Sequence, residues 1–358
     1  MNNRLSSLDV LRGMTIILMI LVNSPGSWNC VWRPLLHADW NGMTLTDMVF
    51  PCFLFIMGVT TYISLRKYQF RWSATFFVKV LRRSITLFAI GLALNYLSAH
   101  CPPLSQLRIM GVLQRFAICY FVVSLLAVSI NNRWFPAIIA VLLGGYATLT
   151  LMCGGYDCGQ ANILVRVDTC LLGTNHMYVE HGLDPEGFLS TLPSIAHTMI
   201  GYCVGSMALA KTTLQSRINN MTIVAILMLF SGLLLAEDIP LNKKIWSATY
   251  VFVTCGLSLL MLVLLALIID VKSARFPQTP FLVFGVNPLF CYVLGELTDI
   301  FMYWVTVGGT PLHDVCYGWL AAVAGDNAFT SFLYSFLMVG FVGMWGYVLY
   351  RRRIYIKI

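Results

Sequence analysis

The chain has 358 residues, of which 58% are hydrophobic and only 11% are charged. Soluble domains average about 25% charged residues, so this composition excludes an ordinary soluble protein and predicts a polytopic membrane protein. The net charge of +8 does not indicate nucleic-acid binding, because the distribution of the charges along the chain decides what they mean. We therefore expect one membrane domain over residues 1–358, with membrane lipid as a partner and no nucleic acid.

The apolar runs predict an all-α fold. A membrane-crossing helix needs about 17–25 mostly apolar residues. About ten runs meet this requirement, at residues 8–24, 44–65, 76–97, 109–130, 134–152, 191–210, 219–236, 246–269, 282–306 and 328–350. The first run is followed by no small-residue cleavage site, so it is interpreted as a span and not as a signal peptide. The segment 315–323 is too short to cross and is expected to be re-entrant or interfacial.

Lysine and arginine predict the orientation, because cytoplasmic ends of spans carry an excess of both. Most of the 23 cations lie at one set of alternating span ends: Arg4, Arg12, Arg66, Lys67, Arg71, Lys79, Arg82, Arg83, Arg133, Lys211, Arg217, Lys272, Arg275, Arg351, Arg352, Arg353 and Lys357. Both termini are therefore predicted to be cytoplasmic. The opposite side carries the longest loop, residues 153–190, and all six histidines lie on that side or in the outer parts of spans.

The clearest candidate for chemistry is His37, which lies close to Asp39 and Asp47 just before the second run and follows Asn23 at the end of the first. Imidazole changes its charge near neutral pH, so it can take a proton from a nucleophile or attack an acyl group itself. Asp47 would orient the ring, and Asn23 would polarise a carbonyl. The structural alternatives are a histidine bonded to a loop carbonyl, Asp47 as the acid of a capping pattern that begins at Thr44, and Asn23 as a helix end.

Polar residues inside the predicted spans form a second group. Arg115, Asn287, Glu296 and Asp299 are costly in a membrane unless they are paired or face a cavity. Arg108 and Arg115 are seven residues apart and are expected on one helix face, as are Glu296 and Asp299. An arginine–carboxylate pair between the fourth and ninth runs would neutralise both charges. Such a pair would serve structure as well as function.

The basic cytoplasmic ends are candidates for binding phosphate. Arg12, Arg66, Arg82 and Arg83 would suit the phosphates of a nucleotide-bearing donor, although such clusters also set topology and bind anionic lipid. The cysteines show no pattern typical of zinc or haem, so no metal is expected. Cys153 and Cys158 flank a Gly-Gly turn and would form a disulfide only in an oxidising compartment.

Several stretches resemble the heparan-alpha-glucosaminide N-acetyltransferase family of transmembrane acyltransferases. They are residues 7–13 (SLDVLRG), 22–23 (VN), 37–42 (HADWNG), 46–51 (TDMVFP), 55–58 (FIMG), 108–115 (RIMGVLQR), 184–187 (DPEG) and 242–247 (NKKIWS). The sequence lacks the N-terminal luminal domain of lysosomal members, so the resemblance is to a bacterial-type member. It also has Asp39 where the lysosomal form has serine.

The resemblance implies transfer of acetyl from cytosolic acetyl-CoA, as donor substrate, to the amine of a terminal glucosamine on the outer side of the membrane. It implies that His37 is catalytic and that Asn23 lies near the acetyl group. It also implies the inner membrane of a bacterium as location and allows a homodimer. The residues we expect to bind the amino sugar or glycan are Asp39, Trp40, Asn41, Asp184, Glu186, Asn242, Lys243 and Trp246.

Two other functions stay open. The first is O-acetylation of a surface glycan by the same histidine. The second is ion-coupled transport through Arg115, Glu296 and Asp299, which predicts inverted repeats and broken helices in matching positions of the two halves. The sequence also leaves open the identity of the glycan and the choice between direct transfer and an acetyl-His37 intermediate.

Overall fold

A computed structural model describes residues 6–159, 161–178, 180, 182–271 and 277–356. Four cations used for the orientation, Arg4, Lys272, Arg275 and Lys357, lie outside the described residues, as does His181. The described helices are α1 (Ser6–Asn23), α2 (Val49–Leu65), α3 (Ala74–Ser98), α4 (Val112–Ser129), α5 (Phe135–Met152), α6 (Ile163–Leu172), α7 (Thr191–Ala208), α8 (Leu214–Leu235), α9 (Ala248–Leu265), α10 (Thr279–Val286), α11 (Pro288–Trp304), α12 (Leu312–Ala324) and α13 (Ala328–Arg351). A small antiparallel hairpin joins β1 (Thr306–Val307) to β2 (Thr310–Pro311).

These helices confirm the all-α fold and the multi-pass membrane class. Seven helices in the described part of the chain are long and apolar enough to cross a membrane, and a bent pair, α10 with α11, raises the number to eight. Helices α3 and α7 also occupy predicted runs, although they do not pass the same test of length and hydropathy. The number of ten spans therefore stays a prediction. Helix α12 covers the segment that was judged too short to cross.

The ninth apolar run is not one straight helix. It breaks at Asn287, where α10 and α11 meet at an angle of 85°. Pro288, which cannot donate a backbone hydrogen bond, begins the second helix. The Asn287 side chain donates to the carbonyl of Ile354 (2.9 Å) and accepts from the N–H of Ile356 (2.9 Å). Its buried amide thus ties the break to the segment that follows α13.

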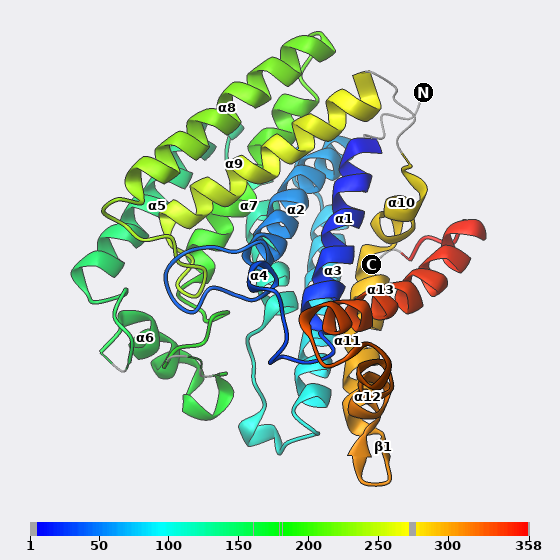
Figure 1. Cartoon of the computed structure of the whole chain (residues 1–358). Helices are drawn as coiled ribbons and strands as arrows, with labels where there is room; N and C mark the ends of the chain where they lie inside the picture. The colour runs from blue at the N-terminus through cyan, green and yellow to red at the C-terminus, as the bar shows by residue number, and fades with distance from the viewer. Residues whose placement is uncertain (1–5, 160, 179, 181, 272–276, 357–358) are drawn as a thin grey trace. The chain divides into compact units, whose positions relative to one another are not determined.

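The chain divides into two compact units. Its first unit comprises, of the described residues, 6–38, 43–49, 264–271 and 277–356, and in it α1 packs against α10, α11 and α13 (Figure 1). Gly13 and Gly285 lie at the crossing of α1 and α10. A Cβ on Gly13 would lie 1.8 Å from the carbonyl oxygen of Phe281, and one on Gly285 would lie 2.0 Å from that of Asp9. Only glycine allows two helix backbones to approach so closely.

The second unit comprises residues 39–42 and 50–263. In it α3 packs against α4, while α7 contacts α4, α5 and α8. The long loop is folded rather than extended, because Leu164, Val165, Leu183 and Leu189 of the loop form one core with Tyr146 of α5 and with Ile245.

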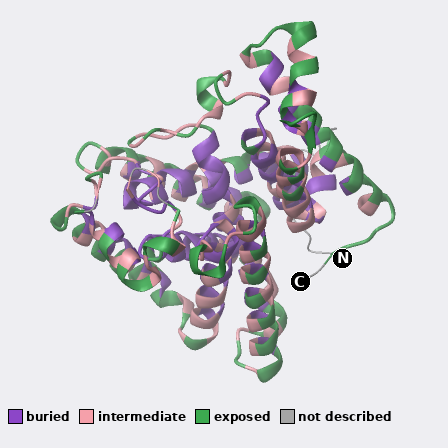
Figure 2. Cartoon of the chain, turned by 90° about the horizontal axis from the view of Figure 1, so that it is seen from below, coloured by how far each residue is buried: buried purple, intermediate pink, exposed green. Residues whose placement is uncertain are grey.

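Buried and exposed residues alternate along individual helices (Figure 2). In α8 only 28% of the span is buried, and Ile226, Phe230 and Leu234 are exposed. In α1 the buried share is 61%. An apolar helix with so little burial is suited to contact with lipid, whereas α1 packs mainly against protein.

Candidate functional site

His37 and Asp47 form a hydrogen-bonded pair in the first unit. His37 lies in the segment between α1 and α2, and Asp47 lies in a 3₁₀ turn, Thr46–Met48, that leads into α2. The His37 Nδ1 is 2.7 Å from the Asp47 Oδ1. The carboxylate is 1% exposed, whereas the imidazole is 48% exposed. Because an ionised carboxylate only accepts, Nδ1 carries the hydrogen and the lone pair lies on Nε2.

The other oxygen of Asp47 organises the loop around His37. Its Oδ2 accepts from the N–H groups of Ala38 (3.1 Å) and Thr44 (3.0 Å). The Thr44 hydroxyl lies 3.0 Å from the same oxygen and 2.6 Å from the carbonyl oxygen of Leu36. The bond to the Thr44 N–H is half of the capping pattern predicted from the sequence. One carboxylate therefore serves both interpretations, since it holds the loop and orients the imidazole.

The chain just after His37 is held within the second unit by a lysine that we did not single out. The Lys244 ammonium donates to the carbonyl of Asp39 (2.5 Å) and forms an ion pair with Glu180 (2.9 Å). Lys244 is 5% exposed, so its charge needs this carboxylate. The signal in the sequence was the pair of adjacent lysines, Lys243 and Lys244, just before the apolar run 246–269. The Asp39 side chain remains exposed.

Two predicted sugar ligands also support this segment. The Trp40 indole donates to the carbonyl of Tyr156 (3.1 Å), and the Asn242 amide donates to the Oδ1 of Asn41 (3.1 Å). Asn242 is fully buried, whereas Asn41 is exposed. Asn242 thus holds the chain through the side-chain oxygen of Asn41, while Asn41 as a residue remains exposed.

Asn23 lies at the last residue of α1 and faces α11. Its Nδ2 donates to the Oε1 of Glu296 at 3.1 Å. The two side chains line a cavity of about 180 Å³ whose other lining residues are Met19, Ile20, Ser24, Trp28, Tyr292, Gly295 and Asp299. Asn23, Glu296 and Asp299 were each predicted as polar candidates, but their grouping was not. The sequence could not show it because 273 residues separate Asn23 from Glu296.

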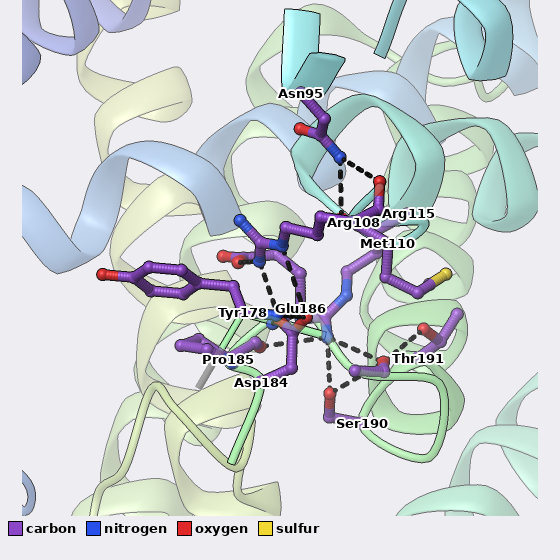
Figure 3. Close-up of polar contacts among 11 residues, drawn as sticks. Asn95, Arg108, Met110, Arg115, Tyr178, Asp184, Pro185, Glu186, Ser190 and Thr191 are labelled. Atoms are coloured by element: carbon purple, nitrogen blue, oxygen red, sulfur yellow. Dashed lines mark hydrogen bonds and ion pairs between the residues drawn. The ribbon is translucent and has the colours of Figure 1, made fainter. Parts of the chain in front are cut away.

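Arg108 binds two carboxylates of the long loop in the second unit (Figure 3). Its Nη2 lies 2.7 Å from the Asp184 Oδ1 and 2.6 Å from the Glu186 Oε2, and its Nε lies 3.3 Å from the Asp184 Oδ2. Asp184 also accepts from the N–H of Tyr178 (3.0 Å). Arg108 precedes α4, which begins at Val112, so the predicted single helix face for the two arginines is wrong.

These contacts correct the expected role of Asp184 in sugar binding. The Asp184 side chain is 0% exposed, and its oxygens are occupied by Arg108 and by backbone N–H groups. The Glu186 side chain is 15% exposed and shares Arg108 with it. Burial favours the neutral form of Glu186, but the charges of Arg108 and Arg115 outweigh burial and hold the pKa of Glu186 below its ordinary value. This cluster holds the loop in place.

Arg115 is fully buried in α4, where it binds the same loop (Figure 3). Its Nη2 donates to the carbonyls of Pro185 (3.1 Å) and Gly187 (3.1 Å) and to the hydroxyl of Ser190. The guanidinium also lies 5.0 Å from the ring centre of Trp246. The expected partner was a carboxylate of the ninth run. Arg115 instead uses backbone carbonyls, which a sequence pattern does not reveal.

Trp246 is not available for stacking on a sugar. It is 1% exposed and has a left-handed backbone, with φ of 55°. Its ring packs edge-on against Phe50 (5.0 Å) and Tyr250 (5.3 Å). Its neighbour Lys243 is partly buried and remains a candidate for contact with an acceptor.

Asp168 is a further buried carboxylate that the sequence analysis missed. It lies in α6, where its Oδ1 accepts from the N–H of Leu189 (2.9 Å) and its Oδ2 has no hydrogen-bond partner among the described residues. Burial raises the pKa of Asp168 to about 6. A Cβ on Gly187 would lie 1.8 Å from the Oδ2, so the close approach requires glycine there. The only signal was one acid in an otherwise mostly apolar segment.

The predicted phosphate ligands differ in availability. Arg12 pairs with Asp9 (2.9 Å) and donates to the carbonyl of Gly285 (3.1 Å). Arg83 stacks over Tyr120, with 4.5 Å between the guanidinium carbon and the ring centre. The residues Arg66 and Arg82 are exposed.

The sequence left open whether Cys153 and Cys158 are bridged. Cys153 and Cys158 are exposed thiols without a disulfide. Across the part of the chain that the structure describes, no three His, Cys, Asp or Glu side chains are grouped to hold a metal ion.

Comparison with known proteins matches the chain to one family. The family model described as heparan-alpha-glucosaminide N-acetyltransferase, catalytic, matches residues 4–235. Heparan-alpha-glucosaminide N-acetyltransferase of Homo sapiens is 31% identical over 83% of this chain and 53% of its own length. The Mus musculus protein of the same name is 28% identical over 83% of this chain and 54% of its own. The chain thus spans about half the length of these relatives.

Proposed function

This chain belongs to the heparan-alpha-glucosaminide N-acetyltransferase family, and from that premise we propose that it is a membrane-embedded N-acetyltransferase. The donor is acetyl-CoA, and the acceptor is the amine of a terminal glucosamine or another amino-sugar glycan. The names of the two relatives support this acceptor class. The chain spans about half the length of these relatives, so the proposal names only the class of acceptor.

The pair formed by His37 and Asp47 is the observation that carries this proposal. Asp47 holds the hydrogen on Nδ1, so Nε2 is the nitrogen that takes a proton from the acceptor amine as the amine attacks the thioester. The new bond joins the amine nitrogen to the acetyl carbon. The bond from that carbon to sulfur breaks, and the proton on His37 passes to the thiolate of CoA. His37 is therefore base and then acid in one cycle.

Asn23 supplies the polarising donor. Its amide has two hydrogens, and one of them is directed at Glu296. The second stabilises the oxyanion that develops on the acetyl oxygen. A single well-placed donor of this kind is worth about 10²–10³ in rate.

Donor and acceptor approach from opposite sides of the membrane. The exposed Arg66 and Arg82 are the ligands we propose for the CoA phosphates, and Arg12 and Arg83 are further candidates. On the outer side the acceptor contacts the exposed residues Asp39 and Asn41. Both termini are cytoplasmic, in the inner membrane of a bacterium.

The acceptor contacts are a revised proposal. Lys243 stays with Asp39 and Asn41 as a ligand for the glycan. Asp184, Asn242 and Trp246 are buried, so they act by holding the outer loop and not by touching the sugar. A homodimer is compatible with this arrangement.

Ion-coupled transport is the less favoured function. It requires broken spans in matching positions of both halves, and the bend at Asn287 is the one break of this kind in the described part of the chain. O-acetylation by His37 differs from the main proposal only in the attacking atom, so the product must decide between them.

Inside-out vesicles provide the test. Labelled acetyl-CoA is added outside and glucosamine is enclosed within. Labelled N-acetylglucosamine in the lumen supports the proposal. Label on hydroxyl groups alone would replace it with O-acetylation, and no transfer at all would favour a transporter. If labelled acetyl is found on the protein when no acceptor is present, an acetyl-His37 intermediate would replace direct transfer.

A further inference from the structure

The cavity between the end of α1 and α11 has the composition of a binding site for an organic cation. It measures about 180 Å³, and Asn23, Trp28, Tyr292, Glu296 and Asp299 supply its polar and aromatic lining. Among the described residues that line it, two are carboxylates and none is Lys, Arg or His. A cavity of about 150 Å³ holds a six-membered ring, so this one is large enough for part of a sugar.

The two carboxylates are arranged to share one positive charge. Glu296 and Asp299 are three residues apart in α11, so they lie on one face of the helix. The partner of Glu296 is the neutral amide of Asn23, at 3.1 Å. Such a contact orients a carboxylate but leaves its charge uncompensated, which is costly within a membrane protein.

Asp299 has two further polar neighbours. Ser24 lines the cavity beside it, and His313 in α12 is near enough to interact with its charge. His313 is committed elsewhere, with Nδ1 2.9 Å from the Asp314 Oδ1 and Nε2 3.1 Å from the carbonyl oxygen of Pro25. His313 is not among the residues that line the cavity, so the lining itself carries only the two carboxylates as charged groups.

Two aromatic residues favour an organic cation over an inorganic one. Trp28 and Tyr292 line the same cavity as the carboxylates. Ring faces attract ammonium groups by about 0.5–2 kcal/mol at close range, and their apolar surface suits the carbons next to the charge.

We propose that this cavity binds the ammonium group of the acceptor amino sugar, between Glu296 and Asp299, and that Glu296 takes the first proton from it. This inference rests on the proposed transferase function and specifies how that site selects an amine. Asn23 connects the two halves of the reaction, because one of its N–H groups is bonded to Glu296 and the other is directed to the acetyl oxygen.

The proton transfers balance. An ammonium has no lone pair and cannot attack, so one proton must leave before the bond to carbon forms. Glu296 accepts that proton and the nitrogen becomes a neutral amine. His37 takes the second proton as the amine attacks the acetyl carbon and returns it to the departing thiolate. The protonated Glu296 then loses its proton to water, and an amide and a free thiol remain.

The test compares Glu296→Gln and Asp299→Asn with wild type in the purified full chain. In Glu296→Gln the new side chain keeps an oxygen that accepts from Asn23, so the fold and the amide position are retained while the charge is lost. Each substitution removes a charged partner, which is worth about 10- to 100-fold in affinity. We expect the KM for glucosamine to rise by that factor, with the KM for acetyl-CoA unchanged. The control is Asp238→Asn, an exposed carboxylate after α8, which should leave both constants unchanged.

A binding measurement separates this inference from the transferase function. Equilibrium dialysis without donor should show labelled glucosamine bound to wild type, displaced by methylammonium chloride and not by sodium chloride, and labelled glucose not bound. Suppose that wild type binds glucosamine, that both variants lose this binding, and that wild type transfers no acetyl. That combination would support the ammonium site and overturn the transferase function. A glucosamine KM within threefold of wild type in both variants would overturn the site and leave the transferase standing. Displacement of glucosamine by sodium chloride and not by methylammonium chloride would also overturn the ammonium site.

Discussion

Replacing Asp47 with Asn tests how the carboxylate acts on His37. The amide has one oxygen and one NH₂ group, so one of the two acceptor positions becomes a donor. If the NH₂ replaced Oδ2, it would face the N–H groups of Ala38 and Thr44, both within 3.1 Å. If the NH₂ replaces Oδ1, it faces only one of these donors, the Nδ1–H of His37. The second orientation is less costly, so the NH₂ will point at the imidazole.

That orientation reverses the histidine tautomer. An NH₂ group can only donate, so Nδ1 becomes the acceptor and the hydrogen moves to Nε2. The nitrogen that should take the proton from the amine then has no lone pair. We expect kcat to fall by about 10²–10⁴, the range for a lost general base or a wrong tautomer. The free energy of unfolding should fall by only about 1 kcal/mol, for one exchanged hydrogen bond.

Steady-state acetyl transfer and thermal unfolding of the same preparation measure both effects. The matched control is Asp314→Asn, which changes the other His–Asp pair, where the carboxylate is 54% exposed. Its kcat should stay within threefold of wild type. A kcat for Asp47→Asn within threefold of wild type would refute the tautomer argument, and an equal loss in Asp314→Asn would show that the effect is not specific to His37.

Two predictions concern stability. Burial raises the pKa of Asp168 from 3.8 to about 6, so this group stabilises the fold below pH 4, and that contribution is lost as the pH rises through 6. Unfolding measured from pH 4 to 8 should show wild type losing about 3 kcal/mol relative to Asp168→Asn, and a constant difference would contradict the burial argument. Arg108→Ala strands the buried carboxylate of Asp184 and should cost about 3–5 kcal/mol in unfolding free energy. Adding Asp184→Asn should recover part of that loss, and simple additivity of the two changes would contradict the pairing.

The helices could be predicted because long apolar runs have few other solutions in a membrane. The bend at Asn287 could not be read from hydropathy, since both sides of it are apolar. The Asn287-Pro288 pair was the local signal, because proline removes a donor and disfavours helix in the residue before it.

The site shows the same division between local and distant information. Asp47 lies ten residues from His37, close enough for a sequence pattern to connect them. Asn23 and Glu296 meet only through the packing of α1 against α11. Asp184 and Trp246 were expected to contact the sugar. Both are buried by tertiary contacts that no local pattern records: Asp184 binds Arg108, and Trp246 packs against Phe50 and Tyr250.

The rate of acetyl transfer by His37→Ala is the most direct test of the proposed mechanism. Purified wild type and variant are compared with labelled acetyl-CoA and glucosamine, and thermal unfolding confirms that both are folded. Loss of N-acetylglucosamine formation by at least about 10²-fold is the expected result. Transfer within threefold of wild type by a folded His37→Ala variant would contradict the central role of His37, both as a base and as an acetyl carrier.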